Sequence, residues 1–336
     1  MIKQVIFLIS LAKRENCMNK NEILSKKLFL FIVIIAVITF FVGLILILLG
    51  YNITICEFFY NNDITYTIFT AISYLGDTTF LIVVIVIVWY VYDVAFAKNL
   101  ALSLLGSYFV NSITKDIGQD PRPWTNVKAN VEGPGFPSGH SQQGVAGYGY
   151  IGYEAYQKNN KVISWIFIIL VYLIAISRVI IGAHDLQDIW GGLLFGMIWL
   201  TIFIVLEPKL SEIITKFSLM IKILLSIIIP IVLFIIAILI FPYTELDYGL
   251  MCGGMMGLSL GYIIGNEKIG YDPKEISTMQ KLINFAIGIV ITLGLYLGLG
   301  FIPLDDLGQM WDFIQYFILA ILLTTLVPWL FTKIQR

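Results

Sequence analysis

Long apolar stretches recur along this chain and alternate with short polar segments. Each stretch has about 20 residues, the length of a helix that crosses the hydrocarbon core of a bilayer. The pattern therefore predicts an all-α, polytopic membrane protein, with a short interfacial helix near 66–74. Ten spans are predicted, at residues 28–50, 78–96, 100–117, 138–156, 162–182, 189–206, 223–241, 249–265, 282–299 and 313–331.

The composition supports a lipid-facing surface. Hydrophobic residues make up 59% of the 336 residues and charged residues only 13%, whereas soluble domains have about 25% charged residues. The net charge of -1 offers no basic field for a nucleic-acid partner. Cys17, Cys56 and Cys252 have no CxxC spacing, so they predict neither a disulfide framework nor a zinc site.

Basic residues indicate the orientation of the spans. If the N-terminus is cytoplasmic and the spans alternate, 17 of the 21 Lys and Arg residues fall in inner segments. The outer segments hold only Lys115, Arg122, Lys128 and Arg178. This bias is the one that the positive-inside rule expects. We therefore expect an integral membrane protein of the cell membrane with both termini in the cytoplasm.

The spans divide into two blocks by their polar content. We expect a cytoplasmic tail at 1–27, a six-span core at 28–206, a cytoplasmic connection at 207–222 and a four-span block at 223–336. The interiors of the last four spans have no charged residue. Glycines there recur every four residues, which predicts close helix packing; they are Gly253, Gly257, Gly261 and Gly265 on the eighth span, with Gly294 and Gly298 on the ninth.

Three polar motifs fall at the predicted outer ends of core spans. They are KDIGQDPRP (115–123), PSGH (137–140) and SRVIIGAHDLQD (177–188). Hydrolysis of a phosphate ester needs cations around the phosphoryl oxygens, a nucleophile and an acid for the leaving oxygen. Lys115, Arg122 and Arg178 can supply the cations, because arginine matches phosphate oxygens with a planar fork.

Both histidines of the chain belong to these motifs. If a helix begins near Ala183, His184 and Asp188 share one face of it. Asp188 can then hold one ring nitrogen of His184 and leave the other free as a nucleophile. His140 follows Ser138 and Gly139 at a predicted helix start, where backbone N–H groups favour an anion, and it can donate a proton to the leaving oxygen.

A zinc site formed by His140, His184 and Asp188 is a formal alternative. The three neighbouring cations would repel a metal ion, so we expect no metal and no cofactor.

Taken together, the pattern K-x6-RP, PSGH and SR-x5-H-x3-D resembles the signature of the type 2 phosphatidic acid phosphatase and vanadium haloperoxidase superfamily. The resemblance covers about residues 66–206 and includes the LGDTTF segment (75–80). It implies a six-helix core, a phosphohistidine intermediate on His184 with Asp188 as its partner, and a general acid at His140. It also implies no metal requirement, and it places around the phosphate the residues Lys115, Arg122, Ser138, Gly139 and Arg178.

The membrane spans favour the phosphatase branch of that superfamily. We expect a metal-independent hydrolase that acts on a lipid phosphate or diphosphate at the extracytoplasmic face. Phosphatidate, an isoprenoid diphosphate, a sphingoid phosphate and phosphatidylglycerophosphate all remain candidate substrates. A sugar-phosphate phosphatase of the same superfamily and a non-catalytic phospholipid carrier or scramblase are the alternatives.

Overall fold

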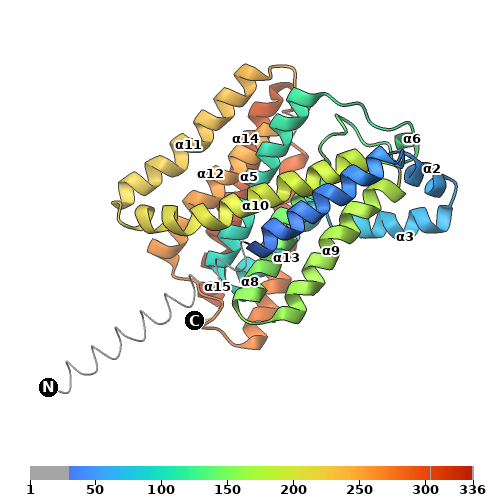
Figure 1. Cartoon of the computed structure of the whole chain (residues 1–336). Coiled ribbons are helices and arrows are strands. Elements are labelled where there is room, and N and C mark those ends of the chain that lie inside the picture. The colour runs from blue at the N-terminus through green and yellow to red at the C-terminus, as the bar shows by residue number, and fades with distance from the viewer. Residues whose placement is uncertain (1–29, 303, 335–336) are drawn as a thin grey trace.

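The computed structural model describes residues 30–302 and 304–334, so the predicted tail at 1–27 lies outside the described residues. Helices build the described part of the chain, and it contains no strand (Figure 1). The first half comprises an unlabelled helix Leu30–Leu48, α2 (Thr54–Tyr60), α3 (Asp63–Tyr74), α4 (Thr78–Ile87), η1 (Val88–Tyr92), α5 (Val94–Gly118), α6 (Asn126–Ala129), α7 (Gly139–Gly144), η2 (Val145–Gly149), α8 (Tyr150–Gln157) and α9 (Lys161–Ile180).

The second half continues the bundle with longer helices. It comprises α10 (Leu186–Thr215), α11 (Leu219–Ile240), α12 (Tyr248–Ile264), η3 (Gly265–Ile269), α13 (Thr278–Gly300), η4 (Asp305–Leu307), α14 (Gln309–Thr324) and α15 (Leu326–Ile334). Because α10 continues to Thr215 and α11 begins at Leu219, most of the predicted connection at 207–222 is helical. The division of the chain at this point stays a prediction.

Within the described residues, seven helices are long and apolar enough to cross a membrane. An eighth span is formed if α3 and the continuous α4–η1 segment, which are bent by 46° at Tyr74–Thr78, count as one. The predicted third and fourth spans are also helical, as α5 and as the run of α7, η2 and α8. These two helices are not among the seven apolar ones because their buried faces are polar. On α5, for example, Ser103, Ser107 and Asn111 are fully buried.

The glycine ridge of α12 packs against α14, as the sequence predicts. A Cβ atom on Gly253 would lie 2.1 Å from the backbone oxygen of Phe313, and one on Gly257 would lie 2.5 Å from that of Phe317. Only glycine permits this approach of the two backbones. The prediction for α13 is wrong for the described residues, because an added Cβ on Gly294 or Gly298 would meet none of their atoms within 4 Å.

The helices up to α10 and the C-terminal helices α11 to α15 meet along α4, η1 and α5. Helix α5 contacts α12, while α4 and η1 contact α13. Tyr90 at the end of α4–η1 is buried and donates a hydrogen bond from its hydroxyl to the backbone oxygen of Leu323 on α14 (2.8 Å). One face of α5 therefore borders the C-terminal helices, and its last turn carries Lys115.

Candidate active site

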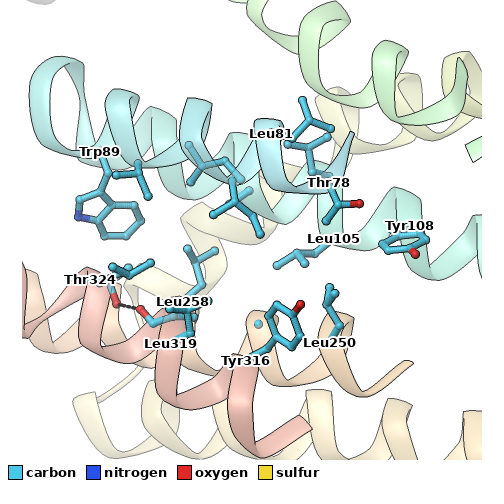
Figure 2. A pocket seen from close by; sticks show the side chains of 18 of the residues that line it. Thr78, Leu81, Trp89, Leu105, Tyr108, Leu250, Leu258, Tyr316, Leu319 and Thr324 are labelled. Atoms are coloured by element: carbon cyan, nitrogen blue, oxygen red, sulfur yellow. Dashed lines mark hydrogen bonds between the residues drawn. The ribbon is translucent and has the colours of Figure 1, made fainter. Parts of the chain in front are cut away.

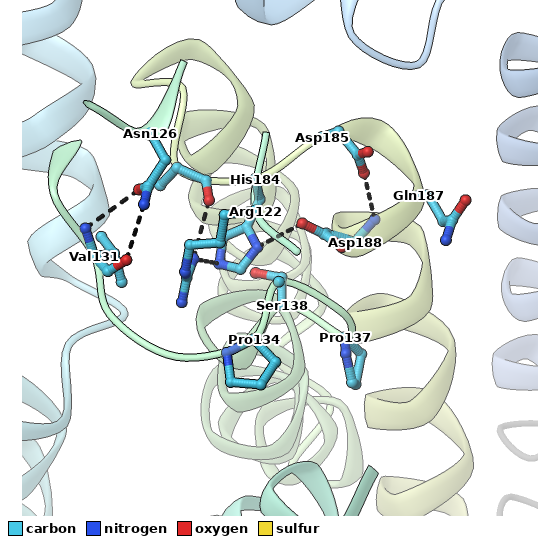
Figure 3. A network of polar contacts seen from close by, with 12 residues as sticks. Arg122, Asn126, Val131, Pro134, Pro137, Ser138, His184, Asp185, Gln187 and Asp188 are labelled. Atoms are coloured by element: carbon cyan, nitrogen blue, oxygen red, sulfur yellow. Dashed lines mark hydrogen bonds and ion pairs between the residues drawn. The ribbon is translucent and has the colours of Figure 1, made fainter. Parts of the chain in front are cut away.

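The three polar motifs meet where four helices begin or end. Lys115 lies in the last turn of α5, Ser138 caps the start of α7, Arg178 lies in the last turn of α9, and His184 precedes the start of α10. Figure 3 shows Arg122, Ser138, His184 and Asp188 facing one another. The structure thus brings every predicted site residue to one end of the core.

His184 lies in the turn between α9 and α10, and not on a helix as the spacing suggested. Helix α10 begins at Leu186, with Asp185 as its N-cap. The turn still places His184 Nδ1 2.9 Å from Asp188 Oδ2, and Arg122 Nη1 lies 3.0 Å from His184 Nε2. Because arginine can only donate, Nε2 must accept, so the ring proton is on Nδ1 and is donated to Asp188.

The surroundings of His184 hold its ring in the neutral form. Its side chain is 2% exposed. Burial, followed by the positive charges of Arg178, Arg122 and Lys115, holds the pKa of His184 well below its usual range. A neutral imidazole with a proton on Nδ1 keeps the lone pair of Nε2 available for attack.

Backbone carbonyls of the 132–135 loop hold two of the cations in place. Arg122 donates to the oxygens of Glu132 (2.8 Å), Gly133 (2.9 Å) and Ala183 (2.9 Å). Lys115 donates to Pro134 and, at 3.3 Å, to Gly135. Burial lowers the pKa of Arg122 to about 10, so its guanidinium stays charged at neutral pH.

Arg178 is the most enclosed of the three cations, with 5% of its side chain exposed. Its Nη1 donates to Ser73 Oγ on α3 (2.7 Å), whereas its buried Nε has no hydrogen-bond partner among the residues that the structure describes. A buried donor without a partner is costly. Its position among two further cations and two histidines makes an anionic oxygen a suitable acceptor for it.

The PSGH motif forms the start of a helix that points at this cluster. The backbone N–H of Ser138 donates to the backbone oxygen of Asp188 (2.9 Å), which ties this turn to α10. The approach requires Gly192, because a Cβ there would lie 2.4 Å from the oxygen of Ser138. The N–H groups of Gly139 and His140 belong to the first turn, where N–H groups have no intrahelical acceptor and can bind an anion.

Three polar residues that the sequence did not single out also support the site. Besides Ser73, Asn52 accepts from the N–H of Gln187 (2.9 Å) and donates to Asp185 (2.8 Å), so it holds the start of α10. Asn111 donates to the oxygen of Pro137 (3.2 Å). Two of them lie near segments that the sequence singles out: Ser73 is two residues before the LGDTTF segment, and Asn111 is one helical turn before Lys115.

Among the residues that the structure describes, no group of three or more His, Cys, Asp or Glu side chains is arranged to hold a metal ion. The polar groups that converge here are three cations, two imidazoles and a helix start. This set can bind a phosphoryl group and provide both a nucleophile and a proton donor.

Comparisons with known proteins show the family of the chain. The model of the PAP2 superfamily matches residues 96–212, and that of the PAP2 superfamily phosphatase, transmembrane extension, matches residues 249–336, together more than half of the chain. The phosphatidylglycerophosphatase B of Bacillus subtilis (strain 168) is 28% identical over 141 residues, which are 39% of this chain and 70% of that protein.

One solved structure is also similar. It is the crystal structure of the first transmembrane PAP2 type phosphatidylglycerolphosphate phosphatase from Bacillus subtilis, at 23% identity and a TM-score of 0.44, over 52% of this chain and 96% of that one. The superfamily predicted from the three motifs is thus confirmed by the two family models. The chain belongs to the PAP2 superfamily, as an integral membrane phosphatase that carries the family's transmembrane extension.

Proposed function

We propose that this phosphatase removes a phosphate group from a lipid phosphate or diphosphate at the extracytoplasmic face, through a phosphohistidine on His184. The observation that carries the proposal is the environment of His184. One ring nitrogen is held by Asp188 at 2.9 Å, and the other faces the guanidinium of Arg122 at 3.0 Å. This is the arrangement of an oriented nucleophile beside a cation that can bind the group under attack.

In the proposed first step, the lone pair of His184 Nε2 forms a bond to phosphorus and the bond to the leaving oxygen breaks. His140, in its protonated form, gives a proton to that oxygen and becomes neutral, and Asp188 stabilises the positive charge on the His184 ring. In the second step, water gives a proton to His140 and attacks phosphorus, and the N–P bond breaks to restore neutral His184. Lys115, Arg122 and Arg178 neutralise the phosphoryl oxygens in both steps.

The lipid substrate is supported by the location of the site. Charged side chains lie at the ends of membrane helices, and the curated relative is a phosphatase whose name specifies a phospholipid, phosphatidylglycerophosphate. A substrate that stays in the bilayer reaches such a site without leaving the membrane.

Phosphate release by the purified protein in detergent tests the proposal. We expect release from at least one lipid phosphate, loss of that release in His184→Ala, inhibition by vanadate and no loss in EDTA. Release from sugar phosphates alone would favour the sugar-phosphate alternative. Binding of lipid phosphates without any release would favour the carrier, and activity lost in EDTA and restored by zinc would contradict the metal-free mechanism.

The proposed sidedness rests on the excess of basic residues in the opposite loops. Val127, beside the site, is 78% exposed, and Glu275, in a loop at the other end, is also exposed. In a background without native cysteines, Val127→Cys should react with a membrane-impermeant thiol reagent on intact cells. Glu275→Cys should react only after lysis, and the reverse pattern would place the site in the cytoplasm.

A further inference from the structure

An apolar cavity lies between the phosphatase core and the C-terminal helices (Figure 2). Its volume is about 120 Å³, and apolar atoms line it almost completely. Helices α4 and α5 form one wall, while α12 and α14 form the other. An apolar cavity of this kind does not hold water well, because it offers too few hydrogen-bond partners. An apolar occupant is therefore favoured.

The cavity is elongated along the helices. Its lining on α4 and η1 runs from Thr78 through Leu81 and Ile85 to Trp89, a stripe with helical spacing. At 1.5 Å per residue this stripe is about 16 Å long. That length is about half the thickness of the hydrocarbon core of a bilayer. The cavity is therefore as long as one hydrocarbon chain in one leaflet.

One end of the cavity adjoins the candidate active site. Thr78 lies two residues after Gly76, and a Cβ on Gly76 would be 3.1 Å from Cδ2 of His140. Gln143 lines the same end and follows His140 by three residues on one helix. Figure 2 shows Thr78 and Tyr108 at this end and Trp89 at the opposite end. A phosphate at the histidines would therefore have its ester oxygen near the entrance.

The C-terminal block contributes a glycine at the middle of the far wall. On α12, the residues that line the cavity are Leu250, Gly254 and Leu258, spaced by four. Gly254 lies on a different face of α12 from the ridge that packs on α14, so helix packing on α14 does not require it. A Cβ on Gly254 would lie 3.4 Å from Leu105, at van der Waals contact, so a side chain larger than alanine would extend into the space between α12 and α5.

We infer that this cavity binds one hydrocarbon chain of the substrate whose phosphate is bound at His184, so that the transmembrane extension helps to select the lipid. This inference rests on the proposed function. It assigns to α12 and α14 a role in substrate binding, while the chemistry stays with the core. Straight acyl chains and polyisoprenyl chains share the apolar chemistry that the cavity recognises.

A cavity-filling variant with a matched control tests the inference. Gly254→Leu should lower kcat/KM for hexadecyl phosphate by about tenfold or more, because the leucine takes the space of the chain, which then loses its packing contacts with the cavity walls. The same variant should leave butyl phosphate unchanged. Gly294→Leu makes the same change on a lipid-facing position of α13 and should alter neither substrate.

Comparison of the two substrates separates this inference from the proposed function. If the unmodified protein hydrolyses hexadecyl phosphate and Gly254→Leu does so equally well, the cavity does not bind the chain. Equal loss for both substrates would also overturn the inference. If the unmodified protein hydrolyses neither substrate nor any other lipid phosphate, it is the proposed function that fails. Farnesyl phosphate in the same series shows whether a branched chain is also accepted.

Photo-crosslinking tests the same inference on the unmodified protein. A hexadecylphosphonate with a diazirine at the chain end cannot lose its phosphorus by hydrolysis. We expect its crosslinks near Trp89 and Leu323, at the end of the cavity away from the site. Crosslinks spread over the exposed faces of α11 and α13, as expected for bulk lipid, would overturn the inference.

Discussion

The core and the C-terminal block bring helices together in different ways. On α5 the buried face carries Ser103, Ser107 and Asn111. Ser103 Oγ donates to the oxygen of Ala146 (2.9 Å), and Asn111 donates to the side chain of Gln142 (2.9 Å) on the helix of the PSGH motif. On α12 the buried face carries glycines that contact the backbone of α14. The first arrangement supports charged groups inside the protein, and the second gives a close contact without polar groups.

This difference predicts which substitutions should affect catalysis and which should affect stability. Polar groups inside a membrane protein are costly and are usually functional. Glycine contacts are steric, so a larger side chain pushes helices apart without touching the chemistry. Variants of the two regions should therefore separate activity from folding.

The largest expected effect is that of His184→Ala on turnover. Loss of a nucleophile costs about four orders of magnitude or more in rate, and His140 cannot replace it in the pair with Asp188. Single-turnover phosphate release measures the loss. His140→Ala is the matched control, and it should be milder for p-nitrophenyl phosphate, whose leaving group needs no proton. Turnover of His184→Ala close to that of the unmodified protein would contradict the mechanism.

A smaller loss is expected from Arg178→Gln. The variant keeps a donor for Ser73 but removes the charge, and the loss of one such group costs about a hundredfold in kcat/KM. Ser73→Ala keeps the charge and removes only the contact at 2.7 Å, so its loss should be about tenfold or less. If both variants retain full activity, Arg178 does not face the phosphate.

In the C-terminal block, Gly253→Ala should destabilise the protein by about 1–3 kcal/mol, because the new Cβ overlaps the backbone of Phe313. Gly294→Ala is the matched control in open space, where alanine favours the helix by up to about 1 kcal/mol. Thermal unfolding in detergent measures both variants. Hydrolysis of butyl phosphate by folded Gly253→Ala should stay unchanged, and a specific loss there would mean that the block contributes to the chemistry.

These two regions also differ in how well the sequence predicts them. The motifs predict which residues converge at the candidate site, and the glycine period predicts the ridge on α12, because both are patterns of neighbouring residues in the sequence. The contacts of Arg178 with Ser73 and of Asn52 with the start of α10 join segments more than 100 residues apart, and no pattern in one sequence reveals them. The prediction for α13 fails for the same reason. The spacing of Gly294 and Gly298 shows that they share a face of the helix, but not whether another helix packs against that face.

A modest loss of stability is expected from a substitution of Asp116, where the core meets the C-terminal block. Asp116, next to Lys115, accepts hydrogen bonds from Thr244 (2.9 and 2.8 Å) and from the hydroxyl of Tyr248 (2.8 Å), just before and at the start of α12. Asp116→Asn should lower the free energy of unfolding by about 1 kcal/mol, as measured by thermal unfolding. Tyr248→Phe removes one of these bonds and should have a smaller effect. A large loss of butyl phosphate hydrolysis in Asp116→Asn would show that Asp116 also positions Lys115.

The smallest expected effect is the response of His184 to pH. Burial and three cations depress its pKa, so the ring should remain neutral as the pH falls from 8 through the value of a free histidine, about 6.5. The chain has two histidines, so protein labelled with ¹³C-histidine gives two ring signals, and His140→Gln assigns them. NMR is preferable to a rate profile, because the phosphate substrate itself titrates near pH 6. Arg122→Gln removes one cation and should move the titration of His184 to higher pH. A midpoint near 6.5 in the unmodified protein would mean that water reaches the ring and that the cations do not act on it.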